Sequence, residues 1–196
     1  MTVEMKATDI VTPPCRLSFP SLFEKSATFR GSDDKKYQAS LLLPPEVDLK
    51  PFYACMEAAM LAKFGKPIKL PASKNPVKNC DEKDLDGYDE GWHYINCKSG
   101  YQPNVLDQKR QEILDPERIF AGCWVRMHLS AFAWDHPTGG RGISFSLNSV
   151  QLVREGERLD GRRGGADVFE DIEVEEMPTD TGAGQAAGGD AEGLFG

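Results

Sequence analysis

The feature that most constrains the fold is the stretch GCWVRMHLSAFAW, residues 122–134, in which two kinds of side chain alternate. Successive residues of a β-strand point to opposite faces of a sheet, so the alternation predicts a strand with one face against an apolar core. The apolar row consists of Cys123, Val125, Met127, Leu129, Ala131 and Ala133. The opposite row, which carries rings and basic groups, consists of Trp124, Arg126, His128, Ser130, Phe132 and Trp134.

Four more segments carry strand signals, either closely spaced apolar side chains or a period-two alternation. They are residues 16–24, 37–43, 92–99 and 142–153. The last of them changes phase at Asn148–Ser149, and a change of phase predicts a β-bulge of the kind that bends strands in small barrels.

Between the early strands, apolar side chains recur at three- and four-residue steps and predict a helix over residues 49–64. Asp48 is the expected N-cap, and Gly65 is expected to end the helix. Residues 66–91 are polar and proline-bearing, which indicates a long surface loop. Several short strands with one helix predict a mainly β fold, a small partly open barrel with one side helix.

The charge is distributed unevenly along the chain. The whole chain has 31 acidic and 23 basic residues, and residues 167–196 hold nine of the acids with no lysine or arginine. Removing the nine leaves 31 − 9 = 22 acids against 23 bases, so the body is close to neutral and the tail carries a charge of −9. We therefore expect a folded domain over residues 1–160 and a disordered acidic tail over residues 161–196. The tail is either an interaction segment beside a polyanion-binding body or a solubilising linker.

Several classes of protein do not fit the composition. No run of about 18 apolar residues is present, so we expect no membrane-spanning helix. The N-terminus lacks a secretory pattern, which predicts a cytoplasmic protein. The five cysteines form no C-x-x-C pair and the three histidines do not fall at zinc-ligand spacing, so we expect reduced thiols, no metal and no cofactor. The alternative is a zinc site built from Cys97, Cys123 and nearby histidines.

The candidate binding surface comes from two strand faces that interleave rings with positive charge. Aromatic rings stack on unpaired bases and basic groups neutralise phosphates, so such faces are typical of single-stranded nucleic-acid binding. Packing under the helix is the alternative for any single ring, and Phe132 is the weaker candidate in its row. Lysines of the loop over residues 66–91 either contact phosphates or are simply solvated. The predicted nucleic-acid-binding residues are Trp92, Tyr94, Lys98, Trp124, Arg126, His128, Trp134 and, on a glycine-rich hairpin, Arg141.

Four segments follow one another along the chain, and DVF and the acidic tail come after them. The four are RLSFPSLFE, KYQASLLLP, AGCWVRMHLSAFAW and GRGISFSLNSVQLVREGERLDG. Together they resemble a family of bacteriophage single-stranded-DNA-binding proteins. The likeness spans about residues 15–170, and the layout is similar to that of the replication single-strand binding proteins of short-tailed phages. The resemblance implies an OB-fold-like five-stranded barrel with one side helix that coats single strands during phage replication, recombination and repair in the infected host. It also implies a tail that recruits a polymerase, helicase or nuclease.

The tail is predicted to compete with DNA for the basic surface and to bind partner proteins through an apolar tip. Its predicted partner-binding residues are Glu170, Asp171, Glu173, Glu175, Glu176, Asp190, Glu192, Leu194 and Phe195. Tails of this kind generally end on the aromatic residue, whereas here Gly196 follows it. A homodimer stays open, because nothing in the sequence decides the oligomeric state.

Two other function classes compete with a non-catalytic DNA-binding protein. One is a protein-binding adaptor of the replication machinery, in which the tail is the active part. The other is a metal-dependent nuclease, whose magnesium ion would be held by an acidic cluster in the loop. The cluster consists of Asp81, Glu82, Asp84, Asp86, Asp89 and Glu90.

Overall fold

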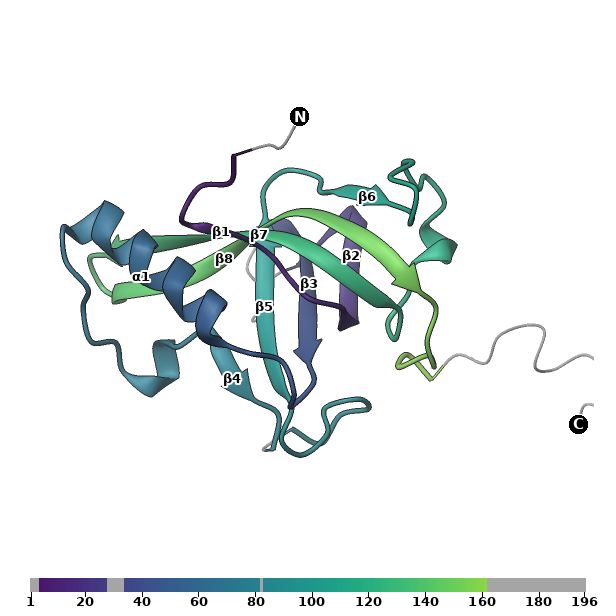
Figure 1. Cartoon of the computed structure of the whole chain (residues 1–196), viewed down its shortest axis with the longest axis horizontal. Coiled ribbons are helices and arrows are strands. Elements are labelled where there is room, and N and C mark those ends of the chain that lie inside the picture. The colour runs from purple at the N-terminus through teal and green to yellow at the C-terminus, as the bar shows by residue number, and fades with distance from the viewer. Residues whose placement is uncertain (1–3, 28–33, 82, 162–196) are drawn as a thin grey trace, which may run out of the picture. The chain divides into compact units, whose positions relative to one another are not determined.

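The computed structural model describes residues 4–27, 34–81 and 83–161. The acidic tail and its predicted partner-binding residues lie outside this part of the chain. Within the described residues the elements follow in chain order (Figure 1). They are β1 (Asp9–Val11), β2 (Cys15–Ala27), β3 (Lys35–Leu43), α1 (Lys50–Phe64), the 3-10 turn η1 (Ala72–Lys74), β4 (Val77–Asn79), β5 (His93–Ser99), β6 (Asn104–Leu106), the 3-10 turn η2 (Pro116–Arg118), β7 (Trp124–His136) and β8 (Gly140–Arg154).

Five of the strands close into a ring. β2 pairs with β3, β3 with β5, β5 with β8, β8 with β7, and β7 returns to β2. Only the β5–β8 pair of this ring is parallel. The five are the strands that the alternating segments predict, and the OB-like barrel with one helix is confirmed. The short strands β1, β4 and β6 add to β7, β5 and β8 respectively and were not predicted.

The apolar row of β7 forms the centre of the core, as the alternation predicts. Val125, Met127 and Leu129 have no exposed surface, and the inward side chains of the other ring strands surround them. Burial of this size provides most of the driving force for closing the ring. The core includes Leu17, Leu41, Ile95, Phe145 and Leu147.

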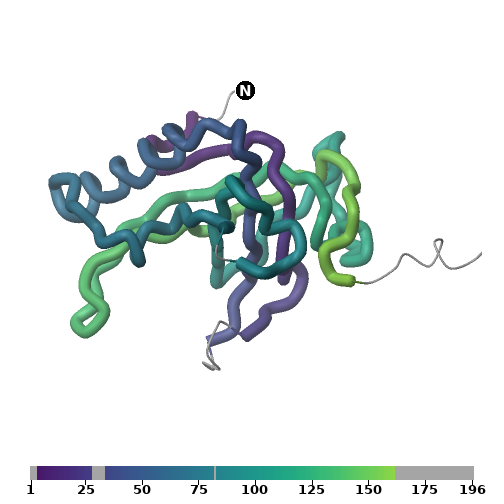
Figure 2. The backbone as a smooth tube through the Cα atoms, turned by 90° about the horizontal axis from the view of Figure 1, so that it is seen from below, coloured from purple at the N-terminus to yellow at the C-terminus, as the bar shows by residue number. Residues whose placement is uncertain are grey.

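Helix α1 lies along β7 and β8 and covers the apolar face of their hairpin (Figure 2). The fully buried ring of Phe52 packs edge-on against Phe145, with centroids 6.3 Å apart. Gly65 ends the helix with a left-handed φ of 72°, as predicted. The N-cap position is Leu49 rather than Asp48, although the Asp48 carboxylate still accepts a hydrogen bond of 3.0 Å from the Lys50 amide.

The change of phase in β8 corresponds to a bulge. His128 is opposite Ser149 and Leu129 is opposite Leu147, so Asn148 is the extra residue that the sequence locates. Its side-chain amide donates a hydrogen bond of 2.7 Å to the hydroxyl of Ser130. The bulge shifts the inward set of side chains from one parity to the other and keeps the core continuous.

The prediction of a plain surface loop over residues 66–91 is wrong in part. β4 pairs with β5, and Cys80 and Tyr88 are buried against the outward side chains of Leu42 and Tyr94. The physical reason is that this corner of the ring is apolar on its outer face as well, so it needs a cover. In the described part of the chain, no helix is long and apolar enough to span a membrane.

Candidate nucleic-acid interface

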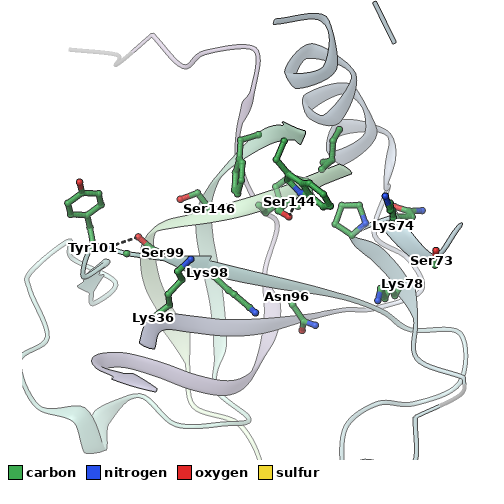
Figure 3. Close-up of a pocket in the computed structure, with 17 residues that line it drawn as sticks. Lys36, Ser73, Lys74, Lys78, Asn96, Lys98, Ser99, Tyr101, Ser144 and Ser146 are labelled. Atoms are coloured by element: carbon green, nitrogen blue, oxygen red, sulfur yellow. Dashed lines mark hydrogen bonds between the residues drawn. The ribbon is translucent and has the colours of Figure 1, made fainter. Parts of the chain in front are cut away.

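A groove of about 610 Å³ lies where β3, β4, β5 and η1 face the projecting end of the β7–β8 hairpin (Figure 3). We call it the lysine groove. In the view of Figure 3, Tyr101 is at one end, Lys74 and Lys78 are at the other, and Lys36 and Lys98 lie between them. Its lining residues are Lys36, Ser73, Lys74, Asn75, Pro76, Lys78, Asn96, Lys98, Ser99, Gly100, Tyr101, Phe132, Trp134, Ile143, Ser144, Phe145 and Ser146.

The lining is positively charged. It contains four lysines and no aspartate or glutamate. Lys78 and Lys98 are exposed, and neither pairs with a carboxylate in the described part of the chain. Lys36 lies 2.9 Å from the Asp34 carboxylate, and both of these side chains remain accessible. Uncompensated ammonium groups along a hollow attract a polyanion, and the attraction weakens as salt rises.

Four aromatic side chains line the lysine groove, of which Phe145 is buried and three are accessible. Tyr101 is 87% exposed and Phe132 is 46% exposed, which is unusual for rings of their size. Trp134 is half-buried. Flat rings beside cations are the chemistry that holds unpaired bases and their phosphates.

Trp134 is held in place by its neighbours. Its indole Nε1 donates a hydrogen bond of 3.1 Å to the hydroxyl of Ser144. The ring covers Gly142, where an added Cβ would lie 2.1 Å from the indole Cζ2. The Lys74 ammonium lies 5.6 Å from the ring centroid. Trp134 therefore forms a fixed platform rather than a swinging side chain.

The helix does not cover this aromatic face. Ala131 pairs with Phe145, which contacts Phe52 of α1, so the helix packs on the apolar face of the hairpin. Phe132 and Trp134 belong to the opposite face because side chains alternate along a strand. For these two residues, packing under the helix is thereby ruled out.

The lysine groove brings together two of the predicted residues, Lys98 and Trp134. It also contains Phe132, which the sequence ranks lower. Of the lysines in the loop over residues 66–91, Lys74 and Lys78 line the groove. Lys36 and Tyr101 were missed, because nothing local marks them. Lys36 is one polar residue of an alternating strand, and Tyr101 follows β5 in a turn.

Trp92 and Trp124 lie elsewhere and contact each other, with ring centroids 6.4 Å apart. The guanidinium of Arg154 lies 4.8 Å from the Trp124 ring centroid, and both tryptophans are half-buried. Trp124 begins β7 and Trp134 is near its end, and ten residues of strand span about 33 Å. The outward row of β7 therefore does not act as one surface.

Tyr94 lies on the outer face of β5, as predicted, but it is not exposed there. Tyr94 is only 8% exposed and its ring packs edge-on against Tyr88, with centroids 5.5 Å apart. Cys80 and Tyr88, which precede β5 in the chain, pack over this part of the strand and cover it. A ring that alternation assigns to the outer face is thus buried by a chain segment that the sequence pattern had assigned to solvent.

Arg126, His128 and Arg141 do not line the lysine groove. Arg126 donates a hydrogen bond of 3.3 Å from Nε to the carbonyl of Thr12, and His128 Nε2 lies 3.8 Å from a carboxylate oxygen of Asp9 on β1. Both belong to the seam where β1 adds to β7. Arg141 pairs with Asp135 at 3.1 Å, and its guanidinium lies 5.0 Å from the ring of Phe64 at the end of α1. The side chains of these three residues therefore make contacts within the fold and are not part of the groove lining.

The family described as Enterobacter phage Enc34, ssDNA-binding protein, has a sequence profile that matches residues 8–179.

The chain belongs to the Enc34 ssDNA-binding family.

Relatives agree with the assignment to the Enc34 family. A protein named p50 from Acyrthosiphon pisum secondary endosymbiont phage 1 is 30% identical over 175 residues, which cover 82% of this chain and 92% of p50. The single-stranded DNA-binding protein of bacteriophage Enc34, solved in complex with ssDNA, has a TM-score of 0.67 at 24% identity, covering 78% of this chain and 90% of that one. Gp2.5, a single-stranded DNA-binding protein of bacteriophage T7, has a TM-score of 0.54 at 16% identity, and the match covers 82% of this chain and 99% of gp2.5. At these identities the two structures support the fold.

The acidic cluster of this Enc34-family chain does not form a metal site in the part that the structure describes. Among those residues, no three side chains of His, Cys, Asp or Glu gather closely enough to hold an ion. Asp81 instead shapes its own loop, because its carboxylate accepts hydrogen bonds from the Asn79 side chain and the Gly91 amide. Glu82 lies outside the described residues.

The five cysteines are all free and buried. Burial raises the pKa of the Cys15 and Cys97 thiols to about 12 and that of Cys80 to about 11. A thiol held neutral in this way is a poor nucleophile and a poor metal ligand. The five cysteines are therefore packing residues of the interior, and their reduced state stays a prediction.

Proposed function

We propose that the protein is a non-catalytic, largely sequence-independent single-stranded-DNA-binding protein that acts in phage DNA replication, recombination and repair. The observation that carries the proposal is the lining of the lysine groove, which combines four lysines and the three accessible rings of Tyr101, Phe132 and Trp134 with no carboxylate. The family assignment and the Enc34 protein solved with ssDNA support it. In an infected bacterium such a protein would act in the cytoplasm.

The groove would bind a single strand through two kinds of contact. The ammonium groups of Lys78 and Lys98 neutralise phosphates, while Phe132, Trp134 and Tyr101 stack against bases. Every base has a flat face, so stacking tolerates any sequence. A duplex keeps its bases stacked inside, which leaves only the charge contacts and favours the unpaired strand.

Affinity for a labelled oligothymidylate, measured across salt concentrations, tests the groove. Four lysines predict a log–log salt slope between about −2 and −3 for a single strand. Lys98→Gln should weaken binding and make the slope shallower by about 0.7, because one phosphate contact is lost. Lys109→Gln, at an exposed lysine outside the groove, is the matched control and should change neither the affinity nor the salt slope. If the two substitutions had equal effects, the lysine groove would not be the DNA-binding site. If the natural chain did not bind the oligonucleotide at all, the result would favour a protein-binding adaptor.

We propose further that residues 1–160 form the DNA-binding domain and that residues 161–196 form a regulatory tail. A segment with nine carboxylates, covalently linked to a domain that carries a basic groove, competes with phosphates at high effective concentration. Once displaced by DNA, its carboxylates and the Leu194–Phe195 tip become available to replication proteins such as a polymerase, helicase or nuclease.

Deleting residues 167–196 should tighten binding of the oligonucleotide at low salt, with the difference shrinking as salt rises. The reason is that the competing anion is removed, and salt screens the competition. Fluorescence anisotropy of both forms measures the effect. Unchanged affinity at low salt would reject competition, while the groove proposal would be unaffected.

A further inference from the structure

Lys74 differs from the other lysines of the groove in what its ammonium contacts. Its Nζ donates hydrogen bonds to two carbonyl oxygens at the end of the β7–β8 hairpin, those of Gly139 and Arg141, the second at 3.0 Å. Lys74 belongs to η1, the turn that connects α1 to β4, so these bonds join segments that are 65 and 67 residues apart. Lys74 is also half-buried, whereas Lys78 and Lys98 are exposed.

The same ammonium contacts the stacking platform. Lys74 Nζ lies 5.6 Å from the centroid of the Trp134 ring. Trp134 is itself fixed to the hairpin through Ser144 and Gly142. Whatever holds the hairpin end against η1 therefore also determines where the Trp134 ring lies relative to Lys78 on the facing wall of the groove.

The geometry of the ammonium leaves it little freedom as a phosphate ligand. A lysine has three N–H donors, and two of those of Lys74 are occupied by carbonyl oxygens. Those oxygens carry partial negative charge, which offsets part of the positive charge that a phosphate would meet. Lys78 and Lys98, by contrast, keep their ammonium groups accessible.

We propose that Lys74 is a positioning residue. It links the end of the β7–β8 hairpin to η1 and thereby sets the width of the lysine groove and the place of Trp134, and it contributes less to phosphate neutralisation than its charge suggests. The effect on DNA depends on the proposed function, but the link itself exists in the free protein and can be tested there.

The experiment compares Lys74→Met with Lys78→Met, two lysines of one groove with opposite expected signatures. Hydrogen exchange in the DNA-free protein should become about 3- to 10-fold faster at the amides of residues 139–142 in Lys74→Met, because two hydrogen bonds are lost. Lys78→Met should leave this exchange unchanged. Lys74→Arg, whose guanidinium can still donate to two carbonyl oxygens, should restore most of the protection.

Affinity for an oligothymidylate gives the second measurement. Lys74→Met should weaken binding about 3- to 10-fold at every salt concentration with little change in the salt slope, since it disturbs geometry rather than charge. Lys78→Met should instead make the slope shallower by about 0.7. The proposal would be overturned if the amides of residues 139–142 exchanged as slowly in Lys74→Met as in the unsubstituted protein. It would also be overturned if Lys74→Met made the salt slope of the affinity as shallow as Lys78→Met does. If the natural protein does not bind DNA, the proposed function fails, and the exchange rates still decide whether Lys74 positions the hairpin.

Discussion

Replacing Gly142 by alanine tests whether Trp134 works as a fixed stacking platform. The new Cβ would lie 2.1, 2.5 and 2.6 Å from three atoms of the indole, Cζ2, Cε2 and Cη2. Carbon atoms pack at about 3.5–4.0 Å, so the ring has to move away by about 1.5 Å. That movement breaks the hydrogen bond from Trp134 Nε1 to Ser144, which is 3.1 Å long.

Two losses follow from the displaced ring. The broken hydrogen bond costs about 1 kcal/mol, and a strained side-chain rotamer costs about 1 kcal/mol more, so the free energy of unfolding should fall by about 2 kcal/mol. If Trp134 stacks on a base, affinity for an oligothymidylate should fall by about 5-fold or more, because stacking contributes roughly 1–3 kcal/mol per base. Thermal unfolding and fluorescence anisotropy measure the two effects.

Gly139→Ala is the matched control in the same hairpin. A Cβ at Gly139 would meet its nearest neighbour, the Cβ of His136, at 3.5 Å, which is ordinary contact. This variant should keep natural stability and affinity. If Gly142→Ala matched it in both measurements, the ring would not be held against the glycine and the platform would be refuted.

Two other predictions test the fold beneath the groove. Tyr94→Ala should lower the free energy of unfolding by about 3–5 kcal/mol, because the ring is buried against Tyr88. Denaturant titration measures the stability, and fluorescence anisotropy measures the affinity for DNA. A loss of affinity without a loss of stability would show that Tyr94 belongs to the binding surface after all. Burial raises the pKa of the Cys15 and Cys97 thiols from 9.0 to about 12, so the folded state retains protons that the unfolded state loses above pH 9. Stability should therefore be unaffected by these thiols below pH 9 and should fall as the pH rises from 9 toward 12. Replacing both cysteines by alanine should flatten this part of the pH profile in thermal unfolding, and an unchanged profile would contradict the assignment.

The local elements of this protein could be read from its sequence because each depends on neighbouring residues. Alternation along residues 122–134 predicted β7 and its buried row, the change of phase at Asn148 located the bulge, and Gly65 marked the end of α1. Lys98 and Trp134 were correctly assigned to outward faces for the same reason. In each case the physical cause, a strand period or a left-handed backbone, acts within a few residues.

What the tertiary structure decided is which outward faces meet each other. Alternation identifies the side of a strand on which a ring lies, but it carries no information about the segment that packs on that side. Tyr94 is covered by Cys80 and Tyr88, while Phe132 and Trp134 stay open because α1 packs on the opposite face of their hairpin. Lys36 and Tyr101 join the lysine groove only because the ring closes and brings β3, β5 and the β7–β8 hairpin together, and ring closure depends on pairings between residues far apart in the chain.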